Sequence, residues 1–402
     1  MRIAEINMIA SGSTGKIMLD IANVARSRGH EVLTFSTNVF SKRYKRLKKA
    51  PEGHKYYGCY LDHGLHYILS KRFGKNGTHS KLSTLCLIRK LKKFKPDIVH
   101  LHNLHKYCIN FDILTRYLKK SGVKVFMTLH DCWTFTGHCP HFDYKNCEKW
   151  KTGCYNCSSL CDYPAEKKDT SKFMYEKKKE WFLSLNDLTL IAPSDWTKSM
   201  AGQSFFKDTP IEVIKTGIDL SVFKPTDSDF RKVYGLEDKF IVLGVADYWG
   251  EKKGLNDFIE LSKTLDDRFK VVLVGTDEQT EKLLPQNVLS IRRTQNQTQL
   301  AEIYSVADAF VNPTKEEVLG LVNIEALACG TPVITYNAGG SPETVDKNCG
   351  IVVDKGDIVA LENAVKRVCE DKPFTKEDCI NRAKQFDKDQ KFLEYVRLYE
   401  KE

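Results

Sequence analysis

Two glutamates lie eight residues apart in a stretch rich in glycine and alanine. Glu317 follows an apolar run that ends at Asn312 and Pro313, and Glu325 lies beyond Gly320. This order predicts a strand, a loop with Glu317, and a helix that begins at Gly320 and carries Glu325. Parallel sheets bind ligands at the carboxyl ends of their strands, and the free N–H groups of a helix start suit a diphosphate. The alternative is a pair of solvated acids.

Other residues could approach a phosphate in the same way. Glycines in the run 11–15, after the first predicted strand, let the backbone come close to a ligand at a helix start. Lys253 precedes Gly254 at another predicted helix start, where an ammonium group can bind phosphate. Gly339 and Gly340 form a third loop of this kind. The sequence therefore indicates several backbone loops for an anionic ligand.

The segment 317–325 resembles the E-x7-E signature of the family 4 retaining glycosyltransferases. Where that family usually has phenylalanine before the glycine, this chain has Leu319. The resemblance implies that Glu317 faces the transferred sugar and that Glu325 binds the ribose hydroxyls of a nucleotide-sugar donor. It also implies that the backbone amides of Gly320 and Leu321 lie near that donor.

Further motifs follow in the family's order across nearly the whole chain. Gly12 and Gly15 lie in a loop that resembles the family's N-terminal glycine loop. His130, followed by Asp131, resembles a strand-end His-Asp pair, which implies a place for His130 near the donor sugar or its phosphate. The run 213–219 resembles a linker between domains, with threonine at position 216 where asparagine is usual.

The lysine motif also resembles the family's, with one departure. Lys253 and Gly254 correspond to the Lys-Gly pair that binds the donor diphosphate, but Tyr248 stands where the family usually has an arginine. Lys252 is the candidate to replace that arginine. The resemblance thus implies that Glu317, His130 and Lys253 are catalytic. It implies a donor-binding set of Glu325, Gly320, Leu321, Gly12, Gly15, Lys252 and Gly340.

Thirteen cysteines occur in the chain, and six of them fall between residues 132 and 161. Four thiolates, at Cys139, Cys147, Cys154 and Cys157, could hold one zinc ion in a tetrahedron. A structural zinc would help to order an insert with few apolar residues, whereas sugar transfer needs no zinc-activated water. The alternative is a set of reduced, partly buried thiols. A similar cysteine-rich loop occurs in the capsule and exopolysaccharide (colanic-acid-type) branch of the family that the chain resembles.

Three histidines form a separate cluster at the end of an apolar run. His100 and His102 are two residues apart on a predicted strand, so their imidazoles share one face, and His105 follows. Such a set could bind a metal, but a metal site usually needs further ligands and hydrogen-bonded supporting groups. We favour a role in packing or in lining an active site.

The formal net charge is +10, and the basic excess is concentrated in the first half of the chain. One interpretation is that the basic clusters form a surface that binds anionic lipid headgroups. Another is that they are solvated helix faces. Nucleic acid is not expected as a partner, because no nucleic-acid-binding motif accompanies the charge. The clusters are Lys42, Arg43, Lys45, Arg46, Lys48 and Lys49; Arg89, Lys90, Lys92, Lys93 and Lys95; and Lys167, Lys168, Lys172, Lys177, Lys178 and Lys179.

The length of 402 residues favours two domains. In both halves, short apolar runs alternate with helical patterns, which is typical of parallel sheets covered on both faces. The resemblance implies the α/β fold called GT-B, with two Rossmann-like domains facing across a cleft. We expect an acceptor-side domain at 1–210 with the cysteine-rich insert at 132–164, a nucleotide-sugar-binding domain at 211–386, and a helix at 387–402 that packs back on the first domain.

Targeting signals are not evident in the sequence. No apolar run reaches the ~18–20 residues that span a bilayer, and the first residues read as a strand rather than a signal peptide. We therefore expect a cytoplasmic protein that can associate peripherally with the inner face of the plasma membrane.

The resemblance implies a retaining transfer of sugar from a nucleotide-diphosphate sugar to a saccharide or lipid-linked saccharide acceptor, in surface polysaccharide biosynthesis. No cofactor is expected for catalysis. The alternatives are a GT-B sugar phosphorylase or sugar-phosphate synthase, an inactive nucleotide-sugar-binding relative, and a zinc-stabilised, basic nucleic-acid-binding protein.

Overall fold

The computed structural model describes residues 1–37, 50–105 and 107–401, and the chain divides into two compact units. The first unit comprises Met1–Ile214 together with the C-terminal residues from Phe392 onward, and the second comprises Lys215–Lys391. The first basic cluster expected from the sequence, at Lys42, Arg43, Lys45, Arg46, Lys48 and Lys49, lies outside the described residues.

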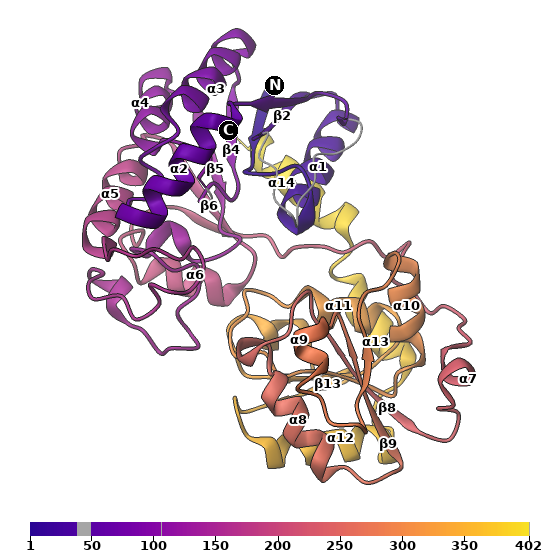
Figure 1. Cartoon of the computed structure of the whole chain (residues 1–402). Coiled ribbons are helices and arrows are strands. Elements are labelled where there is room, and N and C mark those ends of the chain that lie inside the picture. The colour runs from indigo at the N-terminus through magenta and orange to yellow at the C-terminus, as the bar shows by residue number, and fades with distance from the viewer. Residues whose placement is uncertain (38–49, 106, 402) are drawn as a thin grey trace. The chain divides into compact units, whose positions relative to one another are not determined.

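A seven-stranded parallel sheet forms the centre of the first unit, in the order β3-β2-β1-β4-β5-β6-β7 (Figure 1). Its central strands are almost wholly buried, which explains their apolar sequences and requires helices on both faces. The strands are β1 (Arg2–Ile6), β2 (Glu31–Thr37), β3 (His54–Tyr57), β4 (Ile98–Leu101), β5 (Lys124–Thr128), β6 (Leu188–Ala192) and β7 (Ile211–Val213). The helices before the crossover to the second unit are α1 (Gly12–Ser27), α2 (Tyr60–Phe73), α3 (Lys81–Phe94), α4 (Phe111–Ser121), α5 (Ser171–Leu183) and α6 (Asp195–Gly202), with short 3₁₀ turns η1 (Trp133–Phe135) and η2 (Lys149–Lys151).

The second unit repeats this architecture with a six-stranded parallel sheet in the order β10-β9-β8-β11-β12-β13. Its strands are β8 (Phe240–Val245), β9 (Phe269–Val274), β10 (Leu289–Ile291), β11 (Ala309–Asn312), β12 (Val333–Tyr336) and β13 (Gly350–Val353). Its helices are α7 (Phe230–Tyr234), α8 (Leu255–Thr264), α9 (Glu278–Glu281), α10 (Gln297–Val306), α11 (Leu321–Ala328), α12 (Ile358–Asp371) and α13 (Lys376–Lys384), with 3₁₀ turns η3 (Glu251–Lys253) and η4 (Ser341–Thr344). The expectation of two Rossmann-like α/β sheets is confirmed.

The last helix, α14 (Lys388–Glu400), returns to the first unit, as the sequence predicts. Phe392, Tyr395 and Val396 pack in one buried cluster with Ile17 and Ile21 of α1. In Figure 1 this yellow helix lies beside the indigo α1. Apolar burial on one face of α14 therefore holds the end of the chain against the first sheet.

The glycine of the linker motif, Gly217, is required by a close approach of two backbone segments. The backbone N–H of Ile218 donates to the Phe386 carbonyl at 2.8 Å, and the N–H of Lys388 donates to the Ile218 carbonyl at 2.9 Å. A Cβ on Gly217 would lie 2.4 Å from the Cα of Lys388. The two segments that enter and leave the second unit thus run in contact, and only glycine permits that approach.

Some local details differ from the sequence prediction. The edge strands β3 and β7 were not predicted as strands, because each has only three or four residues and few apolar ones. The first strand ends at Ile6, since the side chain of Asn7 donates to Ile9 O and to Thr14 Oγ1 and so turns the chain toward α1. Within the described ranges, we find no helix that combines the length and the apolar character of a bilayer span.

Candidate functional site

Glu317 lies in the second unit, in the loop between β11 and α11. Its Oε2 is 2.7 Å from Nζ of Lys253, which ends the 3₁₀ turn after β8, and its Oε1 accepts from the N–H of Val318 at 3.1 Å. Burial opposes the charge on Lys253, but the Glu317 carboxylate raises the pKa of Lys253 above its usual value. Both side chains are half-buried. The structure therefore pairs two of the predicted catalytic residues directly.

A second ion pair lies next to the first. Nζ of Lys252 is 2.8 Å from Oε1 of Glu316, and the Lys252 carbonyl accepts from the N–H of Lys315 at 2.9 Å. Gly254 follows with a φ of 76°, and a Cβ there would lie 2.4 Å from the Pro313 carbonyl oxygen. The loop after β8 and the loop after β11 are thus joined by charge and by close backbone contact.

The glycine loop after β12 holds the backbone of Glu317. The N–H of Gly340 donates to the Glu317 carbonyl at 3.0 Å. Gly339 has a φ of 56°, and a Cβ there would lie 1.8 Å from that same carbonyl oxygen. The loop that was expected to approach a ligand therefore contacts the protein's own backbone, and it holds the backbone carbonyl of Glu317 in place.

A buried polar network, which the sequence analysis missed, supports the start of α11. The Asn323 side-chain amide donates to Ser341 Oγ at 3.0 Å and to Thr344 Oγ1 at 2.9 Å, while its carbonyl oxygen accepts from Asn312 at 2.7 Å. Asn323 uses both N–H groups and its oxygen, so it is fully satisfied. An asparagine within an otherwise apolar helix was the signal that could have revealed this network.

Gly320 and Leu321 stand at the start of α11. Gly320 has a φ of 88°, in the left-handed region that favours glycine, and α11 begins at Leu321 with no side-chain cap. One turn later, Oε2 of the half-buried Glu325 accepts from the hydroxyl of Tyr304 on α10 at 3.2 Å. Glu317, Gly320, Leu321 and Glu325 thus occupy one loop and helix start at the carboxyl end of the sheet.

In the first unit, the glycine loop lies between β1 and α1. Helix α1 begins at Gly12, which has a φ of 73°, and its N-terminal residue Ser11 makes no side-chain cap. A Cβ on Gly15 would lie 2.6 Å from the backbone carbon of Ala10. Gly15 is therefore required by packing of the loop on its own helix, and Gly12 by the left-handed turn.

His130 follows β5 and joins a hydrogen-bonded group that contains His102 and Glu5. Nε2 of His130 is 2.9 Å from Nδ1 of His102, whose Nε2 is 2.7 Å from Oε2 of Glu5. Burial and the neighbouring His102 hold the pKa of His130 well below its usual range. His105 instead pairs with Asp131 at 2.8 Å. The three histidines that the sequence grouped together thus belong to two different sets.

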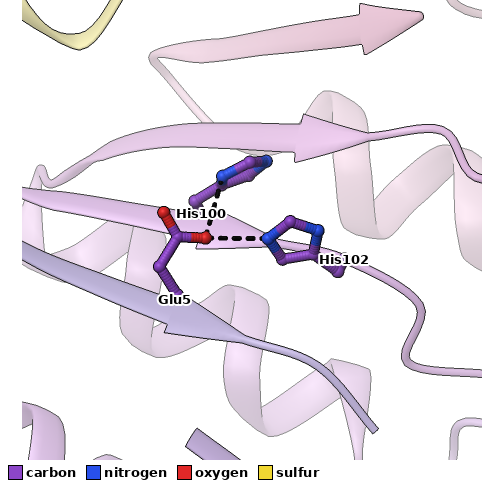
Figure 2. Close-up of side chains that lie close together, drawn as sticks. All are labelled: Glu5, His100 and His102. Atoms are coloured by element: carbon purple, nitrogen blue, oxygen red, sulfur yellow. Dashed lines mark hydrogen bonds and ion pairs between the residues drawn. The ribbon is translucent and has the colours of Figure 1, made fainter. Parts of the chain in front are cut away.

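Glu5, His100 and His102 lie within metal-binding distance of one another, as Figure 2 shows. The imidazoles of His100, on β4, and of His102, just after the strand ends, lie side by side as predicted, with ring centroids 4.1 Å apart. However, the atoms that converge already contact one another: Oε2 of Glu5 is 3.0 Å from Nδ1 of His100 and 2.7 Å from Nε2 of His102, and Nδ1 of His100 is also 2.6 Å from the Tyr399 hydroxyl. We interpret this group as a satisfied polar network rather than a metal site.

The four candidate zinc ligands lie in one region of the insert. The thiol of Cys139 donates to that of Cys157, which lowers the pKa of the Cys157 thiol, and Cys154 Sγ accepts from the N–H of Gly137 at 3.1 Å. Cys147 and Cys154 pack against the core of the first unit. Within the described ranges, no three of these sulfur atoms lie within 4.8 Å of one another. Zinc binding would require them to draw together.

The third basic cluster is only partly on the surface. Lys178 on α5 is fully buried, and its ammonium donates to the carbonyls of Trp133 and Thr136 at 2.6 and 2.8 Å. The expectation that Lys178 belongs to a solvated or lipid-facing surface is therefore wrong. It anchors the start of the cysteine-rich insert to α5 instead.

Comparisons with known proteins agree with this architecture. Residues 14–222 match the family model described as Glycosyltransferase Family 4, and residues 226–386 match that described as Glycosyl transferases group 1. A putative colanic acid biosynthesis glycosyl transferase, WcaC, of Escherichia coli (strain K12) is 27% identical over 274 residues. That match covers 66% of this chain and 66% of the relative, which is just under two thirds of its length.

Two solved structures share the fold over nearly their full lengths. Sucrose-phosphate synthase from Thermosynechococcus elongatus has a TM-score of 0.70 at 20% identity, covering 99% of this chain and 98% of that one. Anabaena Alr3699/HepE in complex with UDP-glucose has a TM-score of 0.66 at 16% identity, covering 99% of both chains. With the two family models matched in succession along two Rossmann-like sheets, the chain belongs to glycosyltransferase family 4 and has the GT-B fold.

Proposed function

We propose that this protein transfers a sugar, with retention of anomeric configuration, from a nucleotide-diphosphate sugar to a saccharide acceptor. The observation that carries the proposal is the Lys253–Glu317 pair at the carboxyl end of the second sheet, beside the uncapped start of α11. The bond between C1 of the sugar and the diphosphate oxygen breaks, and the acceptor oxygen bonds to C1 on the same face. The acceptor hydroxyl gives up its proton to an oxygen of the departing diphosphate.

The second unit offers positive charge for the leaving diphosphate. Lys253 has three N–H groups, of which Glu317 accepts one. The start of α11, which no side chain caps, adds the positive end of the helix dipole. Both groups are fixed before the reaction, so they can stabilise the growing negative charge without reorganisation. Enzymes of this family typically need no metal ion, and Lys253 and the amides take that role in our proposal.

Glu325 is assigned to the nucleotide ribose. Its carboxylate is half-buried, lies one turn into α11, and is oriented by the Tyr304 hydroxyl. A carboxylate can accept hydrogen bonds from two neighbouring ribose hydroxyls. The complex of Anabaena HepE with UDP-glucose supports a nucleotide-sugar donor for this fold. His130, Gly12, Gly15, Lys252 and Gly340 complete the proposed donor set, with Lys252 in the place of the missing arginine.

For the acceptor, we propose a lipid-linked saccharide of surface polysaccharide assembly, since the E. coli relative carries the name of a colanic acid enzyme. Helices α2 and α3 of the first unit present an exposed surface on which basic and large apolar side chains are mixed. On α2, Leu61 is 82% exposed, and on α3, Leu82 is 67% exposed. The other members are Leu65, Ile68, Phe73, Leu85, Lys71, Arg72, Arg89, Lys92 and Lys93. Such a surface suits a membrane that contains anionic lipid.

The leaving-group role of Lys253 can be tested by kinetics with the donor that the protein accepts. Lys253→Met removes the charge beside the diphosphate, so kcat/KM should fall by about 100-fold, as for other single groups that stabilise developing charge. Lys263→Met, which removes a lysine from an exposed Lys–Glu pair on α8, is the matched control and should leave the rate unchanged. Equal rates for the two variants would contradict the assignment, and an inverted product anomer would contradict retention.

Membrane docking can be tested by cosedimentation with phosphatidylcholine vesicles, with and without phosphatidylglycerol, at low salt. The variant with Arg89, Lys92 and Lys93 all changed to Gln should bind the anionic vesicles roughly 100-fold more weakly, since each basic residue contributes ~1 kcal/mol. Val359→Ser, at an exposed apolar position of α12, is the control and should bind as the wild type does. Failure of the wild type to bind anionic vesicles would rule out this surface.

We also propose a structural zinc ion held by Cys139, Cys147, Cys154 and Cys157. Metal analysis of protein purified without chelator should find about one zinc per chain, and Cys154→Ser should lose it. Cys59→Ser, at an exposed cysteine outside the insert, should keep it. A zinc content well under one per chain in the wild type would leave the four residues as ordinary reduced thiols.

A further inference from the structure

A chain of hydrogen bonds runs through the first unit from α14 to the end of β5. The hydroxyl of Tyr399 donates to Oε1 of Glu5 at 3.0 Å. Oε2 of Glu5 is 2.7 Å from Nε2 of His102, and Nδ1 of His102 is 2.9 Å from Nε2 of His130. Figure 2 shows the centre of this chain, where Glu5 lies between His100 and His102.

This chain of hydrogen bonds is accessible at its His130 end. Glu5 and His102 have no exposed surface, and Tyr399 is 2% exposed, whereas His130 is half-buried. The planes of the His102 and His130 rings lie within 21° of each other, so the N–H of one ring can meet the nitrogen lone pair of the other close to the ring plane. Buried polar groups must find their partners within the protein, so the positions of the protons in this chain are set by its buried members.

The order of donors follows from the carboxylate. Burial would raise the pKa of Glu5, but His100 and His102 lower it to about 2, so the carboxylate is ionised and can only accept hydrogen bonds. Nε2 of His102 must therefore carry a proton, and its N–H donates a hydrogen bond to Glu5. Burial, with His100 nearby, lowers the pKa of His102 to about 4, so this ring is neutral and its Nδ1 is an acceptor.

The proton on Nε2 of His102 also determines the tautomer of His130. Because Nδ1 of His102 accepts, Nε2 of His130 must donate to it. His130 is itself neutral, since burial holds its pKa well below the usual range. A neutral imidazole has one proton, and that proton is already used on Nε2. Nδ1 of His130 is left as a lone-pair acceptor.

We propose that Glu5 and His102 are positioning residues that fix His130 in the tautomer protonated on Nε2, so that His130 can only accept a hydrogen bond from its ligand. This inference rests on the proposed function, in which His130 belongs to the donor set. A hydroxyl group can donate to Nδ1 of His130, whereas an ionised phosphate oxygen only accepts and cannot form a hydrogen bond there.

The reverse order of protons is disfavoured. It would need a proton on Nδ1 of His102 as well as on its Nε2, which makes His102 a cation. That charge would be fully buried beside His100, whose ring centroid is 4.1 Å away. An additional buried charge of this kind is expensive unless it is paired with its own carboxylate, and Glu5 is shared by both histidines.

The tautomer can be read directly on the wild-type protein. Histidine is labelled with ¹⁵N, and long-range ¹H–¹⁵N correlation distinguishes protonated from unprotonated ring nitrogens; the His130→Gln spectrum identifies the His130 signals. We expect His130 to carry its proton on Nε2 with Nδ1 bare. A proton on Nδ1, or a cationic ring at neutral pH, would overturn the inference, and neither result depends on any enzymatic activity.

Variants test the control by His102. In His102→Phe the acceptor for Nε2 of His130 is removed, so we expect a mixture of both His130 tautomers. In His54→Phe, which changes a buried histidine of β3 whose ring bonds to Thr34 and Ser36, the His130 signals should stay as in the wild type. Should His102→Phe not fold, Glu5→Gln provides a second variant with the same expectation. An unchanged His130 tautomer in folded His102→Phe or Glu5→Gln would contradict the proposal.

Kinetics then test whether the tautomer matters for transfer. With an accepted donor, His102→Phe and His130→Gln should each lower kcat/KM by about tenfold, the loss expected for one hydrogen bond. The double variant should fall no further, because both changes remove the same interaction. Additive losses, or full activity in His102→Phe, would contradict the positioning role. If no donor is transferred by the wild type, the proposed function fails while the tautomer result still stands.

Discussion

The ion pair between Lys253 and Glu317 is the interaction on which the proposed donor site depends. It joins the turn after β8 to the loop after β11, which are 64 residues apart in the chain. The backbone carbonyl of Glu317 is held separately by the N–H of Gly340, and it lies so close to Gly339 that only glycine fits there. Since Lys253 is half-buried, losing its partner would leave a charge that solvent stabilises only in part. The pair therefore both shapes the site and keeps a cation at the end of the sheet.

The two units differ in how deeply they bury charged groups and in how those charges are balanced. In the second unit Lys253, Glu317 and Glu325 are half-buried, while their support is the buried, neutral network around Asn323. In the first unit a carboxylate, Glu5, is itself fully buried and is balanced by His100, His102 and Tyr399. The last of these comes from α14, so the C-terminal helix supplies a hydrogen bond as well as apolar contacts to the first sheet.

Much of the fold and part of the site could be predicted from the sequence. Glu317, Gly320, Leu321 and Glu325 follow one another in a local pattern, so their common place on a loop and helix start was predictable. The Lys253–Glu317 contact was not, because it joins distant segments. Glu5 was missed for the same reason: a single acid within the apolar run of β1 was its only signal. Likewise, the closeness of the histidines in the sequence suggested one cluster, whereas His102 bonds to Glu5 and His105 bonds to Asp131.

The most direct test of a nucleotide-sugar donor is titration calorimetry of the wild type with UDP, GDP, ADP, CMP and their common sugar conjugates. We expect one nucleotide to bind, and Glu325→Ala to weaken that binding by at least about tenfold, because two ribose hydrogen bonds are lost. Glu260→Ala, at an exposed glutamate of α8, should bind as the wild type does. If no nucleotide binds, or if Glu325→Ala binds as tightly as the wild type, the donor site is not where these residues place it.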